Sequence, residues 1–281
     1  MRAVSRLLLL CLFPLTAQIA LAADDGEQQG NPIAALQWQK GPGADLIASK
    51  ATLHVPAEVM YIDEANSKKF LQLTGNLPDP GNFIVLSRKD DWWATFSFDP
   101  IGYVKDDEKI DADALLKQMQ ENDGPSNEQR RKLGLGELHL DGWYVPPHYD
   151  SVTKRLEWGL KLHSDKGVTL NYTIRLLGRT GVMDATLVSN PQSLDADVKS
   201  FKEVLNGFDF NSGERYSEFR AGDHVAEIGL GALVLGGAAA VAAKKGFFTV
   251  ILGFLAAAWK FILAAVAAAA VKLRSLFSKK E

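Results

Sequence analysis

The sequence predicts an α+β fold, an antiparallel sheet meander with packed helices, followed by C-terminal membrane helices. Three observations carry this prediction. Residues 137–189 alternate apolar and polar side chains between short turn signals, which is typical of strands joined in hairpins. Amphipathic helix patterns precede and follow this region instead of alternating with its strands, which indicates an α+β domain. Between Ile228 and Val271 only Lys244, Lys245 and Lys260 are charged, which predicts helices embedded in a membrane.

The N-terminus has the layout of a secretory signal peptide. Arg2 and Arg6 precede the apolar run Leu7–Leu15, and the small-residue pattern Ala20-Leu21-Ala22 follows where a signal peptidase would cut. We therefore assign residues 1–22 to a cleaved signal peptide and expect the folded domain to lie outside the cytoplasm.

Composition excludes several classes of function. The single cysteine, Cys11, lies inside the signal peptide, so the mature chain has none for disulfides, thiolate metal sites or a cysteine nucleophile. The formal net charge is -3, from 31 basic and 34 acidic residues, so the chain has no excess of positive charge. Nucleic-acid binding is therefore disfavoured, and we expect neither a metal nor a cofactor.

Residues 23–44 are rich in glycine and proline, which predicts a flexible leader before a domain over residues 45–220. The first half of that domain combines strand and helix signals. Its expected elements are strands at 51–55 and 58–63, a helix at 64–75 capped by Asp63 and ended by Gly75, strands at 83–88 and 92–104, a helix at 111–122 capped by Asp111, and a short helix ending near Gly134. Ser126 and Gln129 fit a capping box for the short helix.

The second half of the domain is expected to form the meander, and each strand there should have one buried and one exposed face. The expected buried residues are Leu156, Trp158, Leu160, Leu162, Leu170, Tyr172 and Ile174; the expected exposed residues are Arg155, Glu157, Lys161, His163, Thr169, Asn171, Thr173 and Arg175. By the same alternation, His139 and His163 are interpreted as surface histidines rather than ligands. A helix opened by Ser193 follows the meander, and residues 207–210 are expected to return as an edge strand.

His148 and Asp150 are the low-ranking candidates for catalysis. They are two residues apart, so an extended chain would place them on one side, where Asp150 could orient the imidazole as a general base, with Tyr149 or Ser151 nearby. The GxSxG and HExxH motifs of hydrolases are absent from the sequence. We favour a structural turn in which Asp150 accepts backbone hydrogen bonds.

The segments GWYVPPHYD, LEW, TLNYTIRLLGRTGV and AGDHVAEIGLGALVLGG resemble the bacterial membrane-anchored proteins classified as domain of unknown function 2167. The resemblance extends over nearly the whole mature chain. It implies a signal peptide, an extracytoplasmic domain and C-terminal membrane helices, but no activity, so it assigns no catalytic residue. The closing helix VKSFKEVLNGFDF against a meander is also similar to the layered sheet of photosystem PsbP and Mog1 domains, a likeness of fold rather than function.

Two apolar segments near the C-terminus, residues 225–243 and 246–271, would be about 28 and 39 Å long as helices, against a hydrocarbon core of about 30 Å. Small residues recur on one face of each, which predicts contact with another helix. Lys260 lies on or near the small face of the second segment, where it takes a lipid or ion role or snorkels to the interface. The basic tail, residues 272–281, would be cytoplasmic after one crossing and outside after two. Because basic flanks tend to stay in the cytoplasm, we predict two membrane-embedded helices and a cytoplasmic tail.

These patterns predict a non-enzymatic binding or assembly module tethered to the bacterial inner membrane, with its main domain in the periplasm. Its expected partners are the lipid bilayer and either a second copy of the chain or another membrane protein. One alternative is a hydrolase or transferase that uses His148 and Asp150, with Arg175 or Arg179 holding an anion. The other makes the membrane helices primary, with Lys260 in a lipid or ion role.

Overall fold

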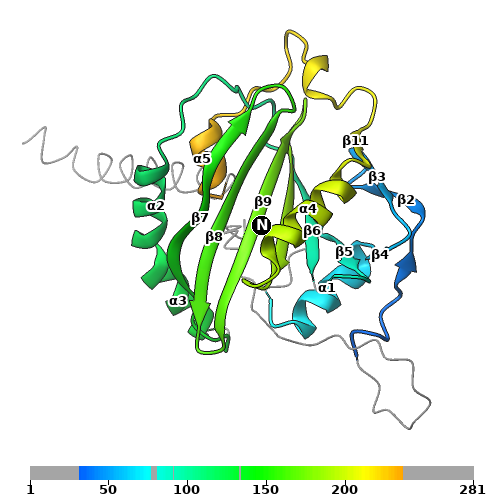
Figure 1. Cartoon of the computed structure of the whole chain (residues 1–281). Coiled ribbons are helices and arrows are strands. Elements are labelled where there is room, and N and C mark those ends of the chain that lie inside the picture. Colours follow the sequence, from blue (N-terminus) through cyan, green and yellow to red (C-terminus); the bar gives the residue numbers. More distant parts are fainter. Residues whose placement is uncertain (1–31, 77–80, 91, 133, 237–281) are drawn as a thin grey trace, which may run out of the picture.

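The computed structural model describes residues 32–76, 81–90, 92–132 and 134–236, which form two antiparallel sheets and surrounding helices (Figure 1). The large sheet has the strand order β1-β4-β5-β6-β10-β9-β8-β7, and the small sheet has the order β11-β3-β2. The strands are β1 (Gln39–Lys40), β2 (Gly43–Ile47), β3 (Ala51–Val55), β4 (Val59–Ile62), β5 (Phe83–Ser87), β6 (Trp93–Asp99), β7 (His139–Asp150), β8 (Arg155–Ser164), β9 (Gly167–Leu177), β10 (Val182–Ser189) and β11 (Phe208–Phe210). The prediction of an antiparallel α+β fold is confirmed.

The described helices confirm two of the three side-chain caps that the sequence predicts. They are α1 (Glu64–Leu73), α2 (Ala112–Glu121), α3 (Asp123–Lys132), α4 (Leu194–Leu205), the 3-10 helix η1 (Tyr216–Glu218) and α5 (Leu230–Val234). Asp63 accepts a hydrogen bond from the backbone N–H of Asn66, and Asp111 accepts one from Ala114, each at 3.0 Å. These bonds pair amides that lack partners inside the first turn of a helix.

The exception is α3, for which the predicted capping box at Ser126 is wrong. The helix begins at Asp123, one residue after the C-cap of α2 at Asn122. Pro125 is tolerated because it lies in the first turn, where a missing N–H breaks no intrahelical bond. Gly134, with φ +71°, ends this helix as expected.

The predicted meander is confirmed, because β7, β8, β9 and β10 are neighbours in chain order and in the sheet. Tight turns at residues 164–167 and 178–181 join the last three strands. β11 lies at an edge of the small sheet, as the sequence predicted. The small sheet and α4 cover one face of the large sheet, on which strand side chains such as Phe96, Ile174 and Met183 are fully buried against Phe201 of α4. We call this the aromatic face.

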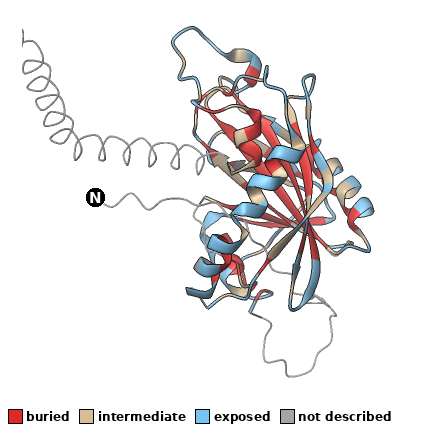
Figure 2. Cartoon of the chain, turned by 90° about the vertical axis from the view of Figure 1, so that its left-hand side faces the viewer, coloured by how far each residue is buried: buried red, intermediate tan, exposed pale blue. Residues whose placement is uncertain are grey.

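The opposite face, which we call the cavity face, carries a mixture of apolar and polar side chains. α1 packs over β4 and β5, whereas α2 and α5 pack over β8. The prediction that the polar side of β9 is exposed is wrong: Thr169, Asn171, Thr173 and Arg175 are 1 to 7% exposed. Glu157 of β8, on the aromatic face, was also expected to be exposed and is 7% exposed. Figure 2 shows the consequence, mainly buried strands between helices whose outer surfaces are exposed.

The predicted flexible leader, residues 23–44, is wrong over its described part. Ile33 and Leu36 are buried beside Phe70 of α1, and the indole N–H of Trp38 donates to the carbonyl oxygen of Ile33 at 2.8 Å. β1 then pairs with β4. Glycine and proline indicated a flexible segment, but the apolar side chains between them hold its described part against the domain.

The start of the first apolar C-terminal segment belongs to the folded domain. Val225 forms a bridge with Tyr103, and the helix begins at Leu230 rather than at Val225. Leu230 and Leu233 are fully buried on the cavity face. Among the described helices, none has both the length and the apolar composition that a membrane crossing requires. The signal peptide, the rest of the 225–243 segment, the 246–271 segment, Lys260 and the tail lie outside the described residues.

Candidate functional site

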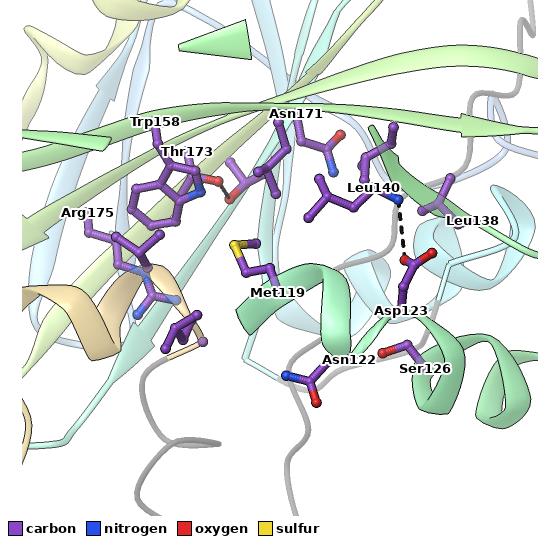
Figure 3. A pocket seen from close by; sticks show the side chains of 16 residues that line it. Met119, Asn122, Asp123, Ser126, Leu138, Leu140, Trp158, Asn171, Thr173 and Arg175 are labelled. Carbon is purple, nitrogen blue, oxygen red and sulfur yellow. Dashed lines mark hydrogen bonds between the residues drawn. The ribbon is translucent and has the colours of Figure 1, made fainter. Parts of the chain in front are cut away.

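A cavity of about 140 Å³ lies on the cavity face, between the sheet and the helices α2, α3 and α5. Its floor comes from β7, β8 and β9, and the end of α5 closes one side at Leu235 and Gly236. Figure 3 shows Met119 of α2 facing Trp158 and Thr173 across this space. Most of the wall is apolar, and its polar side chains come from β9 and β10 and from the junction of α2 with α3. An apolar pocket with a few convergent polar groups is the usual form of a small-ligand site.

Arg175 is the one buried cation on the described cavity wall. Its guanidinium is 5.8 Å from the ring centroid of Trp158, and the residue is 4% exposed. Nη2 lies 3.0 Å from Oδ2 of Asp184, and Nη1 lies 3.6 Å from Oδ2 of Asp99. Nε and Nη1 have no hydrogen-bond partner. Arg175 is therefore held by charge, and its two unbonded nitrogens are buried within the protein.

A polar network continues from Arg175 along the centre of the sheet. The Thr186 hydroxyl donates to Asp184 at 2.8 Å, and it is 3.0 Å from the hydroxyl of Thr173. Oδ1 of Asn171 has no hydrogen-bond partner, although Asn171 also lines the cavity. These residues face the same way because residues that pair across antiparallel strands share a face: Arg175 pairs with Asp184, and Thr173 pairs with Thr186.

A close backbone approach positions α5 over the cavity. A Cβ atom at Gly229 would lie 1.9 Å from Oε2 of Glu108, so a larger residue would displace this carboxylate. The same oxygen accepts a hydrogen bond from the backbone N–H of Gly231 at 3.2 Å. Glycine at 229 thus lets the carboxylate reach the start of α5, where helical N–H groups lack partners. This contact seats Leu233 and Val234 beside the sheet.

A stacked pair of histidines lies beside the cavity, at the end of the β7–β8 hairpin. The rings of His139 and His163 are stacked with centroids 5.1 Å apart. Nδ1 of His139 is 2.9 Å from Oδ2 of Asp123, a cavity-lining residue, and Nδ1 of His163 is 2.5 Å from Oδ1 of Asp141. The hydrogen bond with Asp123 raises the pKa of His139 above its usual value. Both histidines are partly exposed, as expected. The alternation of the strands does not predict that their rings stack or that each has a carboxylate partner.

The structure does not bring together the predicted pair His148 and Asp150. Asp150 accepts hydrogen bonds from the backbone N–H of Val152 at 2.8 Å and from the Thr153 hydroxyl at 2.8 Å, which is the turn favoured from the sequence. His148 lies 3.9 Å from Glu157 instead. Glu157 in turn accepts from the Tyr172 hydroxyl and pairs with Lys202 of α4, both at 2.7 Å.

The other sequence candidates also have defined positions. Arg179 forms a two-pronged ion pair with Asp223, with both hydrogen bonds at 2.7 Å, and this pair lowers the pKa of Asp223 to about 2. Arg179 therefore fastens the β9–β10 turn to the segment that leads to α5, whereas Arg175 lies at the cavity. Within the described ranges, no group of three or more histidine, aspartate or glutamate side chains is arranged to hold a metal ion.

Comparison with known proteins places the chain in a family. The sequence matches the family described as Protein of unknown function (DUF2167) over residues 39–268. The chain belongs to this family. A search of curated proteins found no match to this DUF2167 protein. Among solved structures it is similar to cyanobacterial PsbP (CyanoP) from Synechocystis sp. PCC 6803, with 13% sequence identity, 66% of this chain and 98% of that chain covered, and a TM-score of 0.34. A likeness at this TM-score carries no argument about the site.

Proposed function

We propose that this DUF2167 protein is a non-enzymatic binding module that takes a small, mainly apolar ligand into the cavity between α2, α5 and the sheet. The supporting observation is the cavity itself, a space of about 140 Å³ with a largely apolar wall that includes a few polar side chains, which is the usual form of a small-ligand site. A ligand that fills this cavity gains van der Waals contacts with the apolar side chains of its wall, so the cavity favours occupation.

The catalytic alternative has less support. Asp150 is engaged in its own turn, and His148 lies on the aromatic face beside Glu157, away from the cavity. Residues of the described cavity offer hydrogen bonds and apolar contact to a ligand. Binding is therefore the function that this geometry favours over hydrolysis or group transfer.

We also propose the location that the sequence predicts. The signal peptide exports the chain, its domain lies in the periplasm, and its C-terminal segments tether it to the inner membrane. The lipid bilayer and a second copy or a membrane protein remain the proposed partners. Leu235 and Gly236, at the end of the described chain, line the cavity. A bound ligand would thus contact the start of the apolar segment, which is a physical route from ligand binding to the tether. The similarity of the layered sheet to PsbP and Mog1 domains stays a hypothesis about fold.

The binding proposal is tested by native mass spectrometry of the full chain, purified in lipid nanodiscs from bacterial membranes. We expect a co-purifying small molecule that is lost from a Met119→Trp variant, because the indole would fill the cavity. A Lys199→Trp variant, with its change on exposed α4, is the matched control and should retain the molecule. Absence of any bound molecule, together with failure of added benzene to bind, would refute the proposal.

The location is tested separately with a Ser278→Cys variant, in which the introduced thiol is the only one after signal cleavage. Membrane fractionation should recover the chain with the inner membrane. Labelling of intact cells by an impermeant maleimide would place the tail outside, and protection until the membrane is opened would place it in the cytoplasm. Recovery of the chain in a soluble periplasmic fraction would contradict the tether.

A further inference from the structure

We infer that the cavity takes the end of an unbranched hydrocarbon chain, the alkyl part of an amphiphile whose polar end stays at Asn122. This inference rests on the proposed binding function and adds the chemistry and the shape of the ligand. Three properties of the cavity carry it: the groups that its wall presents, its elongated form, and the position of its exposed end.

The floor of the cavity presents few polar groups that a ligand can use. The hydroxyls of Thr173 and Thr186 lie 3.0 Å apart and bond to each other. Nη2 of Arg175 pairs with Asp184 at 3.0 Å, and the other two nitrogens of Arg175 are buried within the protein. A polar ligand group at this floor would leave water without gaining a partner, which is costly. A hydrocarbon chain has no such cost and gains contacts with the apolar wall.

The lining residues follow the strands, which makes the cavity long. They alternate along two paired strands: Trp158, Leu160 and Leu162 on β8, and Asn171, Thr173 and Arg175 on β9. Each set spans four residues, or about 13 Å of extended chain, whereas a compact space of about 140 Å³ would extend over about half of that distance. A straight alkyl chain fits an elongated space of this kind, and a branched skeleton with the same number of carbons is wider.

The exposed end of the cavity lies at the junction of α2 and α3. Of the lining residues that the structure describes, Asn122 is the exposed one, and the side chain of Asp123 beside it is 27% exposed. Figure 3 shows Asp123 and Arg175 on opposite sides of the pocket. A head group placed at Asn122 keeps its contact with water while the chain lies along the sheet.

The volume of the cavity sets the length of the buried chain. An apolar cavity of about 150 Å³ holds benzene, so about 140 Å³ holds on the order of six carbons. Each methylene that moves from water to an apolar environment raises the affinity about fourfold, the equivalent of about 0.8 kcal/mol. Affinity should therefore rise with chain length until the cavity is full.

The test compares 1-hexanol with its branched isomer 2-ethyl-1-butanol, with 1-butanol as a shorter chain and benzene as a compact apolar probe. The full chain carries ¹³C-methyl labels on methionine and is held in nanodiscs of phosphatidylcholine with methyl-branched phytanoyl chains. The free concentration of each probe is measured in the aqueous phase. Met119 lines the cavity, whereas Met60 and Met183 lie elsewhere, so its methyl signal reports local binding and theirs control for general effects. A Met119→Leu variant assigns the signal.

We expect 1-hexanol to shift the Met119 signal alone, with an affinity about tenfold above those of 1-butanol and 2-ethyl-1-butanol. Leu160→Trp should abolish this shift, because the indole would fill the space. Lys161→Trp makes the same change at the exposed neighbour, on the other face of β8, and should retain the shift. Leu160→Ala should widen the cavity and raise the affinity for 2-ethyl-1-butanol to that for 1-hexanol.

A second arm separates two sources of the chain, a bilayer lipid and a free amphiphile. Nanodiscs of palmitoyl-oleoyl phosphatidylcholine offer straight acyl chains. If a bilayer lipid supplies the chain, these nanodiscs should shift the Met119 signal before any probe is added and weaken 1-hexanol binding at least tenfold. If the chain belongs to a free amphiphile, 1-hexanol should bind equally in both kinds of nanodisc. Either result supports the inferred chain and identifies its source.

Different failures have different meanings. If benzene binds in the phytanoyl nanodiscs but 1-hexanol has no advantage over 2-ethyl-1-butanol, the inferred chain is wrong and the binding function stands. If Leu160→Trp retains 1-hexanol, the chain does not lie in the cavity and the inference is overturned. If none of the four probes shifts Met119, both the inference and the proposed function fail. Should Leu160→Trp not fold, Leu160→Ala decides, because an unchanged preference for the straight chain in that variant overturns the inference.

Discussion

The two faces of the large sheet use the same strands in different ways. On the aromatic face, ring side chains of β5, β6 and α4 pack edge to face, as in the contact of Phe201 with Phe96 at 6.1 Å and with Trp92 at 5.7 Å. On the cavity face, β9 and β10 bury threonine, asparagine, aspartate and arginine side chains beneath helices. Close packing of apolar groups stabilises a fold, whereas buried polar groups beside a cavity lower stability unless they are satisfied. The difference separates a stabilising face from the face on which we propose that a ligand binds.

The largest expected effect is on the aromatic face. Replacing Phe201, which is fully buried, by alanine should lower the free energy of unfolding by about 3 to 5 kcal/mol, through lost apolar burial and a residual cavity. Met119→Ala on the cavity face should cost only about 1 kcal/mol, since this side chain is half-buried and already borders a cavity. Urea unfolding of the two variants measures both. Equal costs would remove the distinction between the faces.

The second-largest loss of stability is expected when the buried cation of Arg175 is removed. Arg175→Met would leave Asp184 and Asp99 without the guanidinium, and breaking a buried ion pair costs about 3 kcal/mol or more. Adding Asp184→Asn to this variant should restore part of the lost stability, because it removes one uncompensated carboxylate. A double-mutant cycle by urea unfolding provides the coupling energy. Additive effects of the two substitutions would contradict a direct interaction across the cavity face.

The stabilisation from the ion pair between Arg179 and Asp223, which fastens the segment before α5, should depend on pH. Arg179 lowers the folded-state pKa of Asp223 to about 2, below its usual 3.8. The pair therefore stabilises the fold above about pH 4, and this contribution is lost as the pH falls toward 2. Thermal unfolding of Arg179→Met should show a deficit at pH 5 to 7 that shrinks between pH 4 and 2. If the stability deficit of Arg179→Met stays constant over this pH range, the deficit does not come from the ion pair with Asp223.

The smallest effect is expected at the histidine pair beside the cavity. The hydrogen bond with Asp123 raises the folded-state pKa of His139 above 6.5. Its stabilisation is thus fully present below pH 6.5 and is lost as the pH rises through the folded-state pKa. Because His139 is partly exposed, the contribution should be about 0.5 kcal/mol or less. NMR titration should give a lower pKa for His139 in Asp123→Asn than in the native chain; an unchanged value would exclude this pair as the cause.

Elements with strong local signals were predictable. Asp63 and Asp111 cap their helices because each side chain reaches an amide of the first turn, a contact within four residues of sequence. Asp150 forms its turn for the same reason. The start of α3 was missed because Ser126 and Gln129 match a capping pattern, while Asp123 continues directly from α2.

The candidate site was only partly predictable. The sequence predicts Arg175 as an anion-binding candidate in an enzyme that uses His148. It also predicts that Arg175 lies on an exposed strand face, whereas the residue is buried. No local pattern shows that Asp99 and Asp184 lie beside it, because the first of these contacts joins residues far apart in the sequence. Met119 lies within the helix predicted over residues 111–122, but no sequence pattern indicates that it borders a cavity.

The sequence by itself determined the antiparallel meander, the capped helices, the DUF2167 membership, and which side chains share a strand face, since these depend on residue spacing and local hydrogen bonds. Only the tertiary structure decided that both strand faces are covered, that Ile33 and Leu36 fasten the leader to α1, and that α5 is packed over the sheet. Alternation reports the chemistry of a strand face, but its exposure depends on which distant segment packs on it. On β9 those segments are α2 and α5, and they turn a polar strand face into the buried wall of a cavity.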